Sequence, residues 1–359
     1  MNDKQLNPSP KENVRVAAAH LASVFFDVDA GVTKALRTIR EAAKQGADIV
    51  VFPESFIPGF PIWNAVKNPI DGHEYFTRFA KSSIRVDGPE IKAIARAAAG
   101  CGVAVSLGFS ERAPYSEGCL WNAAILISPQ GVIVNHHRKL VPTFYEKLTW
   151  NRGDGAGLHV VELPFGRVGG LICGENGNPL ARYSLMAQGE QIHCANYPSV
   201  WPFKDPRSNE PYDLTEAIRV RSAAHSFEAK VYTVVSAGFL DEESLNAVAD
   251  SKDAREILEA SPKSASMIVA PDGSTPGGIL SDEEGIVIAD VNVEALAELK
   301  QHHDMAGYYN RHDVFHFQID RTRQRPLIDL GGQSSVATSQ VNADPDPQTD
   351  LEQSVASRS

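Results

Sequence analysis

Apolar positions follow two different spacings along most of the chain. Residues 14–20 and 48–52 are short, mostly apolar runs that predict strands, the second of them buried, whereas apolar residues recur at helical spacing over 31–45 between them. Helices between strands predict an α/β fold with some antiparallel pairing around the turn Pro129-Gln130-Gly131. The other predicted strands are 103–108, 122–128, 132–136, 158–162, 168–173, 191–195, 231–235, 266–270 and 285–290, and the other predicted helices are 89–99, 179–188 and 212–228.

The same pattern predicts one main domain with polar ends. Nothing between residues 14 and 293 has the composition of a linker, and we place the domain at 14–315, after a polar segment at 1–13. Residues 316–330 form a C-terminal extension. Residues 331–359 are rich in Ser, Gln, Asp, Thr and Pro, so burial cannot repay their ordering entropy and a disordered tail is expected.

Charge and cysteine usage narrow the class of protein. The net charge is -11, and no run of Lys and Arg exceeds a pair, which disfavours nucleic acid as a partner and favours a small uncharged substrate. The chain has no apolar stretch of membrane-spanning length and a polar start, so a cytoplasmic protein with no membrane contact is expected. Its four cysteines have no close pairing, which predicts free thiols and no metal site.

Cys173 is the first candidate for chemistry. It ends an apolar strand and precedes a short turn before the helix that Pro179 begins. A thiol at such a junction projects from the sheet, and nearby helix amides are expected to lower its pKa. The alternative is a buried structural cysteine, the commoner role of a lone free cysteine.

Two further strand ends carry charged side chains. Glu54 follows an apolar run and a proline, where partial burial raises a carboxyl pKa toward general-base use; the alternative is a glutamate facing water. Lys139 follows the predicted strand 132–136 in a cluster of cationic and imidazole groups, for which a solvated face is the alternative. A carboxylate, a cation and a thiol at three strand ends favour a common catalytic site.

The sequence around these three residues resembles the nitrilase (carbon-nitrogen hydrolase) superfamily over about residues 14–315, with several spaced motifs in the same order. The motifs are Phe52-Pro53-Glu54 with Pro58-Gly59-Phe60-Pro61, His137-Arg138-Lys139-Leu140 with Pro142-Thr143 and Glu146, and Val168-Gly169-Gly170-Leu171-Ile172-Cys173. The resemblance implies an αββα sandwich, a Glu54-Lys139-Cys173 triad, Glu146 as a second active-site glutamate and no cofactor. For Glu146, the alternative is a surface ion pair with Lys147 or Arg152. The family also forms dimers that extend into spirals, so a homo-oligomer is expected.

Other segments are similar to the true nitrilase branch rather than to aliphatic amidases. These segments are Trp150-Asn151-Arg152-Gly153-Asp154-Gly155, Pro179-Leu180-Ala181-Arg182-Tyr183, Ala187-Gln188-Gly189-Glu190-Gln191-Ile192-His193 and Gly307-Tyr308-Tyr309-Asn310-Arg311-His312-Asp313-Val314. One departure concerns the nucleophile: nitrilases usually follow it with Trp, Glu and His or Asn, whereas this chain has Gly174, Glu175 and Asn176. The missing indole and imidazole bear on substrate preference and on the ratio of acid to amide product.

The expected activity is hydrolysis of an organic nitrile through a thioimidate and a thioester on Cys173, with Glu54 as base and Lys139 as the cation beside nitrogen. Phe56 and Trp201 are candidate substrate-binding residues, although both also suit ordinary packing. The competing functions are an amidase or N-carbamoyl hydrolase with the same triad, and an inactive scaffold of the same fold. The scaffold is disfavoured because all three chemical positions hold competent residues.

Overall fold

A computed structural model describes residues 13–208 and 212–327. The predicted polar segment 1–13, except for its last residue, and the predicted tail 331–359 lie outside the described residues. Residues up to Gln324 belong to one compact unit, and a second unit begins at Arg325. No helix among the described residues is long and apolar enough to cross a membrane.

One sheet is built from the strands of the N-terminal half and the last strand, in the order β12-β1-β2-β3-β4-β5. Strands β1, β2 and β3 are parallel, and β12, β4 and β5 each run antiparallel to a neighbour. The β4–β5 pair is the antiparallel hairpin predicted around Gly131. The strands are β1 (Val14–Ala22), β2 (Ile49–Val51), β3 (Ala104–Arg112), β4 (Leu120–Ile127), β5 (Ile133–Arg138) and β12 (Gly285–Val291).

The second sheet has the order β6-β7-β8-β9-β10-β11, with β7, β8 and β9 parallel. Leu21 and Ala22 at the end of β1 pair with Gly238 and Phe239 of β9, so this short contact joins the two sheets of the described chain. The strands are β6 (Val161–Leu163), β7 (Gly166–Ile172), β8 (Ile192–Tyr197), β9 (Tyr232–Phe239), β10 (Ser266–Val269) and β11 (Ile279–Leu280).

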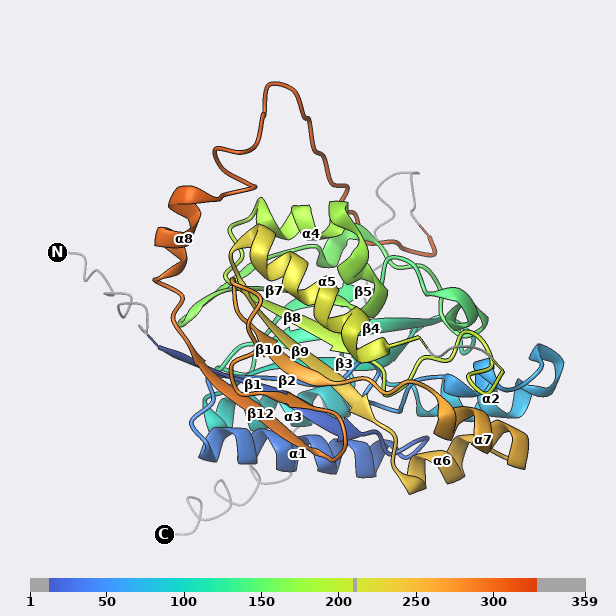
Figure 1. Ribbon diagram of the computed structural model, residues 1–359. Helices are drawn as coiled ribbons and strands as arrows, with labels where there is room; N and C mark the ends of the chain where they lie inside the picture. Colours follow the sequence, from blue (N-terminus) through green and yellow to red (C-terminus); the bar gives the residue numbers. More distant parts are fainter. Residues whose placement is uncertain (1–12, 209–211, 328–359) are drawn as a thin grey trace, which may run out of the picture. The chain divides into compact units, whose positions relative to one another are not determined.

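The two sheets pack face to face between layers of helices (Figure 1). Their inner faces share one apolar cluster, in which Val16 of β1 meets side chains such as Val168 and Val234. Helices α1 (Val28–Lys44) and α3 (Pro89–Cys101) cover the outer face of the first sheet, and α4 (Pro179–Met186) and α5 (Leu214–Ala229) cover that of the second. The architecture is therefore the αββα sandwich.

Each strand and helix predicted from the apolar pattern has a counterpart in the structure. The ends shift most in β3 and β9, which extend four residues beyond the predicted strands 103–108 and 231–235. At 158–162 a 3-10 turn at Gly155–Gly157 precedes the strand, and only Val161–Leu163 is extended. The pattern did not indicate β11 or four further helices, of which α6 and α7 begin at capping side chains, Asp241 and Ser251, that accept hydrogen bonds from Ser244 N and Ala254 N. The four helices are α2 (His73–Ser82), α6 (Glu242–Val248), α7 (Lys252–Ala260) and α8 (Leu296–His302).

Candidate active site

Three strand ends from the two sheets meet at one place. Glu54 follows β2, Lys139 follows β5 directly, and Cys173 follows β7 of the other sheet. The Glu54 amide donates to the carbonyl of Tyr197 at the end of β8 (3.2 Å), which fixes this turn against the second sheet. The segment before Glu54 passes close to Gly108 of β3, where a side chain would not fit: a Cβ there would lie 2.2 Å from the Pro53 carbonyl oxygen.

Lys139 lies between two carboxylates. Its ammonium donates to Glu54 Oε1 at 2.8 Å and to Glu146 Oε2 at 2.7 Å, and all three side chains are almost completely buried. Asn122 of β4 donates its amide to the same Glu54 oxygen at 2.7 Å, and the Thr143 amide donates to Glu146 Oε2 at 3.0 Å. Glu146 therefore pairs with Lys139, and no ion pair with Lys147 or Arg152 is present in the described chain.

Cys173 adopts a left-handed backbone conformation, with φ of 51°. This conformation is strained for a residue with a side chain, and such strain is typical of nucleophiles on a sharp turn after a strand. Its sulfur, one oxygen of Glu54 and one of Glu146 lie within 4.8 Å of one another. The half-buried thiol is thus within reach of both carboxylates.

Burial shifts the proton affinities at this site. Burial, with the nearby Glu146 charge, raises the pKa of Glu54 to about 7 even though Lys139 opposes the shift. Burial and the charge of Glu54 raise the pKa of the Cys173 thiol well above its ordinary value. The expectation that helix amides lower the thiol pKa is therefore wrong for this state, because burial among carboxylates outweighs nearby cations, and the thiol needs a base to become nucleophilic.

Two carboxylate oxygens of the cluster remain without partners in the described part of the chain. They are Glu54 Oε2 and Glu146 Oε1, both buried. Buried carboxylate oxygens normally accept hydrogen bonds, so these two are available for a proton or for a bound water or substrate.

Glu175 accepts hydrogen bonds from the segment after β5, which carries Lys139, and from β7, which leads to Cys173. One oxygen accepts from the Leu140 amide (2.6 Å) and the other from the Ile172 amide (2.9 Å), while His137 Nε2 lies 2.9 Å from the latter. The glutamate of the motif thus orients both strand ends rather than facing the thiol. At the adjacent Gly174, a Cβ would lie 3.2 Å from Thr143 Oγ1, a tight contact that the threonine side chain would have to relieve.

A second buried polar cluster, formed by Glu190, His193 and His225, is linked to the turn at Cys173 through Asn176. The two carboxylate oxygens of Glu190 pair with His193 Nδ1 and His225 Nε2, each at 2.8 Å. His193 Nε2 lies 2.8 Å from Asn176 Oδ1, and the Asn176 amide donates to the Cys173 carbonyl at 3.0 Å. This cluster and the Glu54-Glu146-Cys173 group each bring three possible metal ligands together. Glu190 already pairs with both imidazoles, and in the other group one oxygen of each carboxylate pairs with Lys139.

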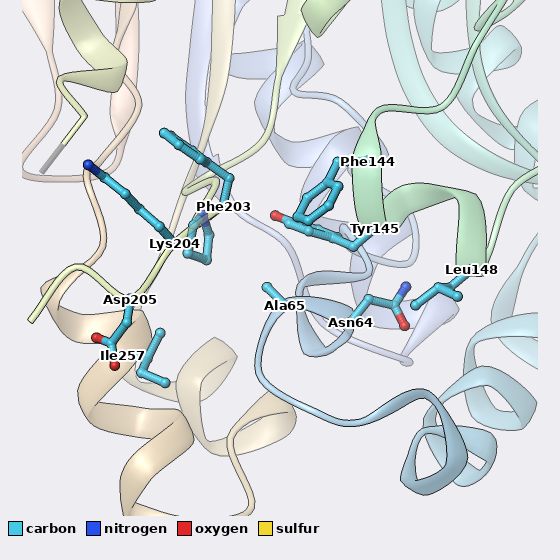
Figure 2. A pocket seen from close by; sticks show the side chains of 10 residues that line it. Asn64, Ala65, Phe144, Tyr145, Leu148, Phe203, Lys204, Asp205 and Ile257 are labelled. Carbon is cyan, nitrogen blue, oxygen red and sulfur yellow. The ribbon is translucent and has the colours of Figure 1, made fainter. Parts of the chain in front are cut away.

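A cavity of about 520 Å³ is bordered by Tyr145 and other side chains of the described chain (Figure 2). Apolar groups dominate its walls, and Lys204 and Asp205 lie at the edge. Tyr145, the neighbour of Glu146, contributes to the wall and stacks on Trp201 at 5.8 Å between ring centroids. The lining residues are Asn64, Ala65, Phe144, Tyr145, Leu148, Pro202, Phe203, Lys204, Asp205 and Ile257.

The two aromatic candidates from the sequence have different positions. Phe56 is fully buried in the core under α1 and contacts Phe52 at 5.3 Å between centroids, which favours the packing alternative; its contact with substrate stays a prediction. Its neighbour Ser55 has φ of 47°, in the left-handed region. Trp201 lies behind the cavity wall, where its role stays a prediction.

Sequence reasoning missed Asn122, Tyr145 and the Glu190 cluster. A polar Asn at the start of the apolar run of β4 was a usable signal for Asn122. Tyr145 also adjoins a motif glutamate. The pairing of Glu190 with His225 joins two segments distant in sequence, for which the chain offers no local signal.

Comparison with known proteins agrees with this geometry. Residues 15–301 match the carbon-nitrogen hydrolase family model. A nitrilase of Penicillium rubens is 33% identical over 89% of this chain and 96% of its own length, and an arylacetone-specific nitrilase of Alcaligenes faecalis is 32% identical over 90% and 89%. Saccharomyces cerevisiae Nit3, of branch 10 of the nitrilase superfamily, has a similar fold, with a TM-score of 0.63 and 17% identity over 85% of this chain and 98% of that one.

Proposed function

Because the chain belongs to the carbon-nitrogen hydrolase family and to its nitrilase branch, we propose that it hydrolyses an organic nitrile to a carboxylic acid and ammonia, with Cys173 as nucleophile. The observation that carries the proposal is the buried Lys139 ammonium between Glu54 and Glu146, with the Cys173 sulfur within 4.8 Å of both carboxylates. This arrangement combines a nucleophile, a base and a cation in one water-poor place.

In the first step, Glu54 removes the thiol proton as the sulfur attacks the nitrile carbon. A carboxylate with a pKa raised to about 7 is a better base than an ordinary one, and its free Oε2 can hold the proton. The C≡N bond becomes C=N, nitrogen takes the proton that Glu54 removed from the thiol, and the Lys139 ammonium stabilises the negative charge that develops on nitrogen. The product is a thioimidate on Cys173.

Water then adds to the thioimidate carbon, and Glu54 takes one of its protons. Glu146 helps to hold this water, because its Oε1 is buried without a partner among the described residues and faces the same cluster. The tetrahedral intermediate expels nitrogen as ammonia and leaves a thioester. A second water cleaves the C–S bond, releases the acid and returns the proton to sulfur.

The test is a pair of substrates that differ only in the carbon-nitrogen group. A nitrile and its matching amide are incubated with the protein, and ammonia, acid and amide are measured. Faster ammonia release from the nitrile, with a covalent adduct on Cys173 by intact mass, is expected. Turnover of the amide alone indicates an amidase with the same cluster, and an absence of both turnover and adduct indicates an inactive scaffold.

We also propose a homo-oligomer, supported by exposed apolar side chains on α4, α5 and the segment after α8. Leu180, Val220, Phe227, Val314 and Phe315 are each at least half exposed. Contiguous exposed apolar groups favour protein association. Light scattering of Phe227→Lys against the parent tests this, because a lysine in the contact should lower the oligomer mass.

A further inference from the structure

The turn that carries Cys173 is restrained by the side chain of Asn176. Cys173 has φ of 51°, and a strained conformation of this kind persists only where its surroundings impose it. Asn176, which is only 2% exposed, donates its amide to the carbonyl oxygens of Cys173 at 3.0 Å and Leu171 at 3.3 Å. These carbonyls belong to the peptide groups before and after the N–Cα bond of Cys173, so one amide restrains the rotation that sets φ.

His193 fixes the orientation of the Asn176 amide. Because the NH₂ group of Asn176 faces two carbonyls, its Oδ1 faces His193 Nε2, at 2.8 Å. An amide oxygen only accepts hydrogen bonds, so His193 Nε2 carries a proton. On the other side of the ring, Nδ1 lies 2.8 Å from Glu190 Oε1. The imidazole therefore connects Glu190 to the amide that holds the cysteine turn.

The hydrogen bonds also define the charges of this cluster. Although burial opposes the shift, the imidazoles of His193 and His225 lower the pKa of Glu190 to about 2, so Glu190 is a carboxylate. His193 then donates from both ring nitrogens and is an imidazolium in a buried ion pair. Burial and the charge of His193 lower the pKa of His225 to about 4, and its Nδ1 has no partner among the described residues. His225 is therefore a neutral imidazole that donates to Glu190 from Nε2.

We propose that Asn176 and His193 are positioning residues for the nucleophile Cys173. The amide of Asn176 holds the Cys173 backbone in the conformation that directs the sulfur toward Glu54. The ion pair of His193 with Glu190 keeps that amide in the required orientation. Loss of the amide lets the turn relax toward a negative φ, so the sulfur moves away from its base. This inference rests on the proposed function only in that Cys173 is the nucleophile.

The first experiment compares His193→Gln with His193→Asn. A glutamine amide reaches the position of Nε2 and still donates to Asn176, whereas an asparagine amide reaches the position of Nδ1 and donates only to Glu190. Both variants lose the imidazolium, so both should have a lower free energy of unfolding in urea. We expect kcat of folded His193→Gln to stay within about threefold of the parent value, and that of His193→Asn to fall roughly tenfold, the effect of one lost hydrogen bond.

The second experiment is Asn176→Asp, which removes only the donor. The carboxylate still accepts from His193 but cannot donate to the Cys173 carbonyl. We expect kcat to fall roughly tenfold to a hundredfold, with KM within about twofold because Asn176 acts on the backbone and not on the substrate. Asn178→Asp is the matched control, since it adds the same charge to the same segment. Asn178 Oδ1 only accepts, from the amides at the start of α4, so this variant should keep the parental kcat.

Alkylation of Cys173 by iodoacetamide, followed by intact mass, gives a measure that needs no nitrile. Alkylation should slow most in Asn176→Asp, less in His193→Asn and least in His193→Gln, because it depends on the thiol lying beside its base. Parental kcat and alkylation in folded Asn176→Asp, or equal losses in the two His193 variants, would overturn the positioning role. If the parent turns over no nitrile but the variants show this order of alkylation, the proposed function is contradicted and the positioning role stands.

Discussion

The pKa values of two buried glutamates in this chain are shifted in opposite directions from the ordinary value. Glu54 shares the Lys139 ammonium with Glu146, and its pKa is raised to about 7. Glu190 has the imidazoles of His193 and His225 on its two oxygens, and its pKa is lowered to about 2. Both are equally inaccessible to solvent, so burial alone does not decide the outcome.

The difference lies in how completely each carboxylate is paired. Both oxygens of Glu190 have partners, whereas Glu54 Oε2 and Glu146 Oε1 have none in the described chain. A buried polar cluster in which every group has a hydrogen-bond partner stabilises the fold. A cluster that lacks some partners can still bind a proton, water or substrate, but it lowers stability. We therefore expect substitutions in the first cluster to affect turnover and those in the second to affect stability.

The largest expected effect is that of Cys173→Ala. Loss of the nucleophile should reduce turnover by at least about 10⁴-fold, as it does where a covalent nucleophile is removed from other hydrolases. Folding should be unaffected, because a half-buried thiol contributes little packing. Ammonia release and circular dichroism measure the two effects, and Cys101→Ser, Cys119→Ser and Cys194→Ser are matched controls that should keep the chemistry. Normal turnover by the alanine variant would remove Cys173 from the mechanism.

The two clusters also differ in how far the sequence could predict them. Strand ends bearing Glu54, Lys139 and Cys173 were visible because each follows an apolar run, and family motifs indicated that they share a site. The order of the strands in the two sheets could not be predicted. The alternation of apolar and polar residues along a strand indicates which face is buried, but it does not identify the neighbouring strand. The His225 partner of Glu190 and the packing of Phe56 against Phe52 depend on tertiary contacts, for which no spacing rule exists.

Glu54→Gln should give the next largest loss of turnover. Unlike a substitution of Glu190, it should not lower the free energy of unfolding above pH 7. Removing the base should lower kcat by about 10² to 10⁴-fold. In the parent, kcat/KM should rise with pH through about 7, the raised pKa of Glu54, if its deprotonation limits attack. Since that pKa is above the ordinary 4.5, Glu54 favours the folded state at low pH and this contribution is lost as pH rises toward 7.

The amide that replaces the carboxylate in Glu54→Gln carries no buried charge, so this variant should be at least as stable as the parent above pH 7 in urea unfolding. Lys139 keeps its pair with Glu146 in this variant. Near-parental turnover would sink the assignment of Glu54 as the base. Lower stability at pH 8 would contradict the contrast between the two clusters.

Lys139→Met keeps an apolar stem and removes the cation that two carboxylates share. Loss of stabilisation of the developing negative charge on nitrogen should cost about 2.7 to 4 kcal/mol in the barrier, or about 10² to 10³-fold in turnover. Stability should fall as well, because Glu54 and Glu146 become buried carboxylates without a cation. Steady-state kinetics on the folded fraction separates the two effects, and the exposed Lys252→Met is the control. A folded variant with parental turnover would contradict the proposed role.

Glu190→Gln should have the smallest effect on turnover. It keeps the shape but breaks the charge-assisted pairs with His193 and His225; the drop in the pKa of Glu190 from 4.5 to about 2 corresponds to a stabilisation of about 3 kcal/mol at 1.36 kcal/mol per pKa unit. Because this pKa is lowered, the stabilisation is fully present above pH 4.5 and is lost as pH falls toward 2. The loss in the free energy of unfolding of the variant, measured with urea, should therefore be full at pH 7 and smaller at pH 4.

The kcat of the folded variant should fall less than about tenfold, since the cluster reaches Cys173 only through the Asn176 hydrogen bond to its carbonyl. A loss of turnover as large as that of Glu54→Gln, with stability unchanged, would show that Glu190 acts in the chemistry rather than in holding the cysteine turn.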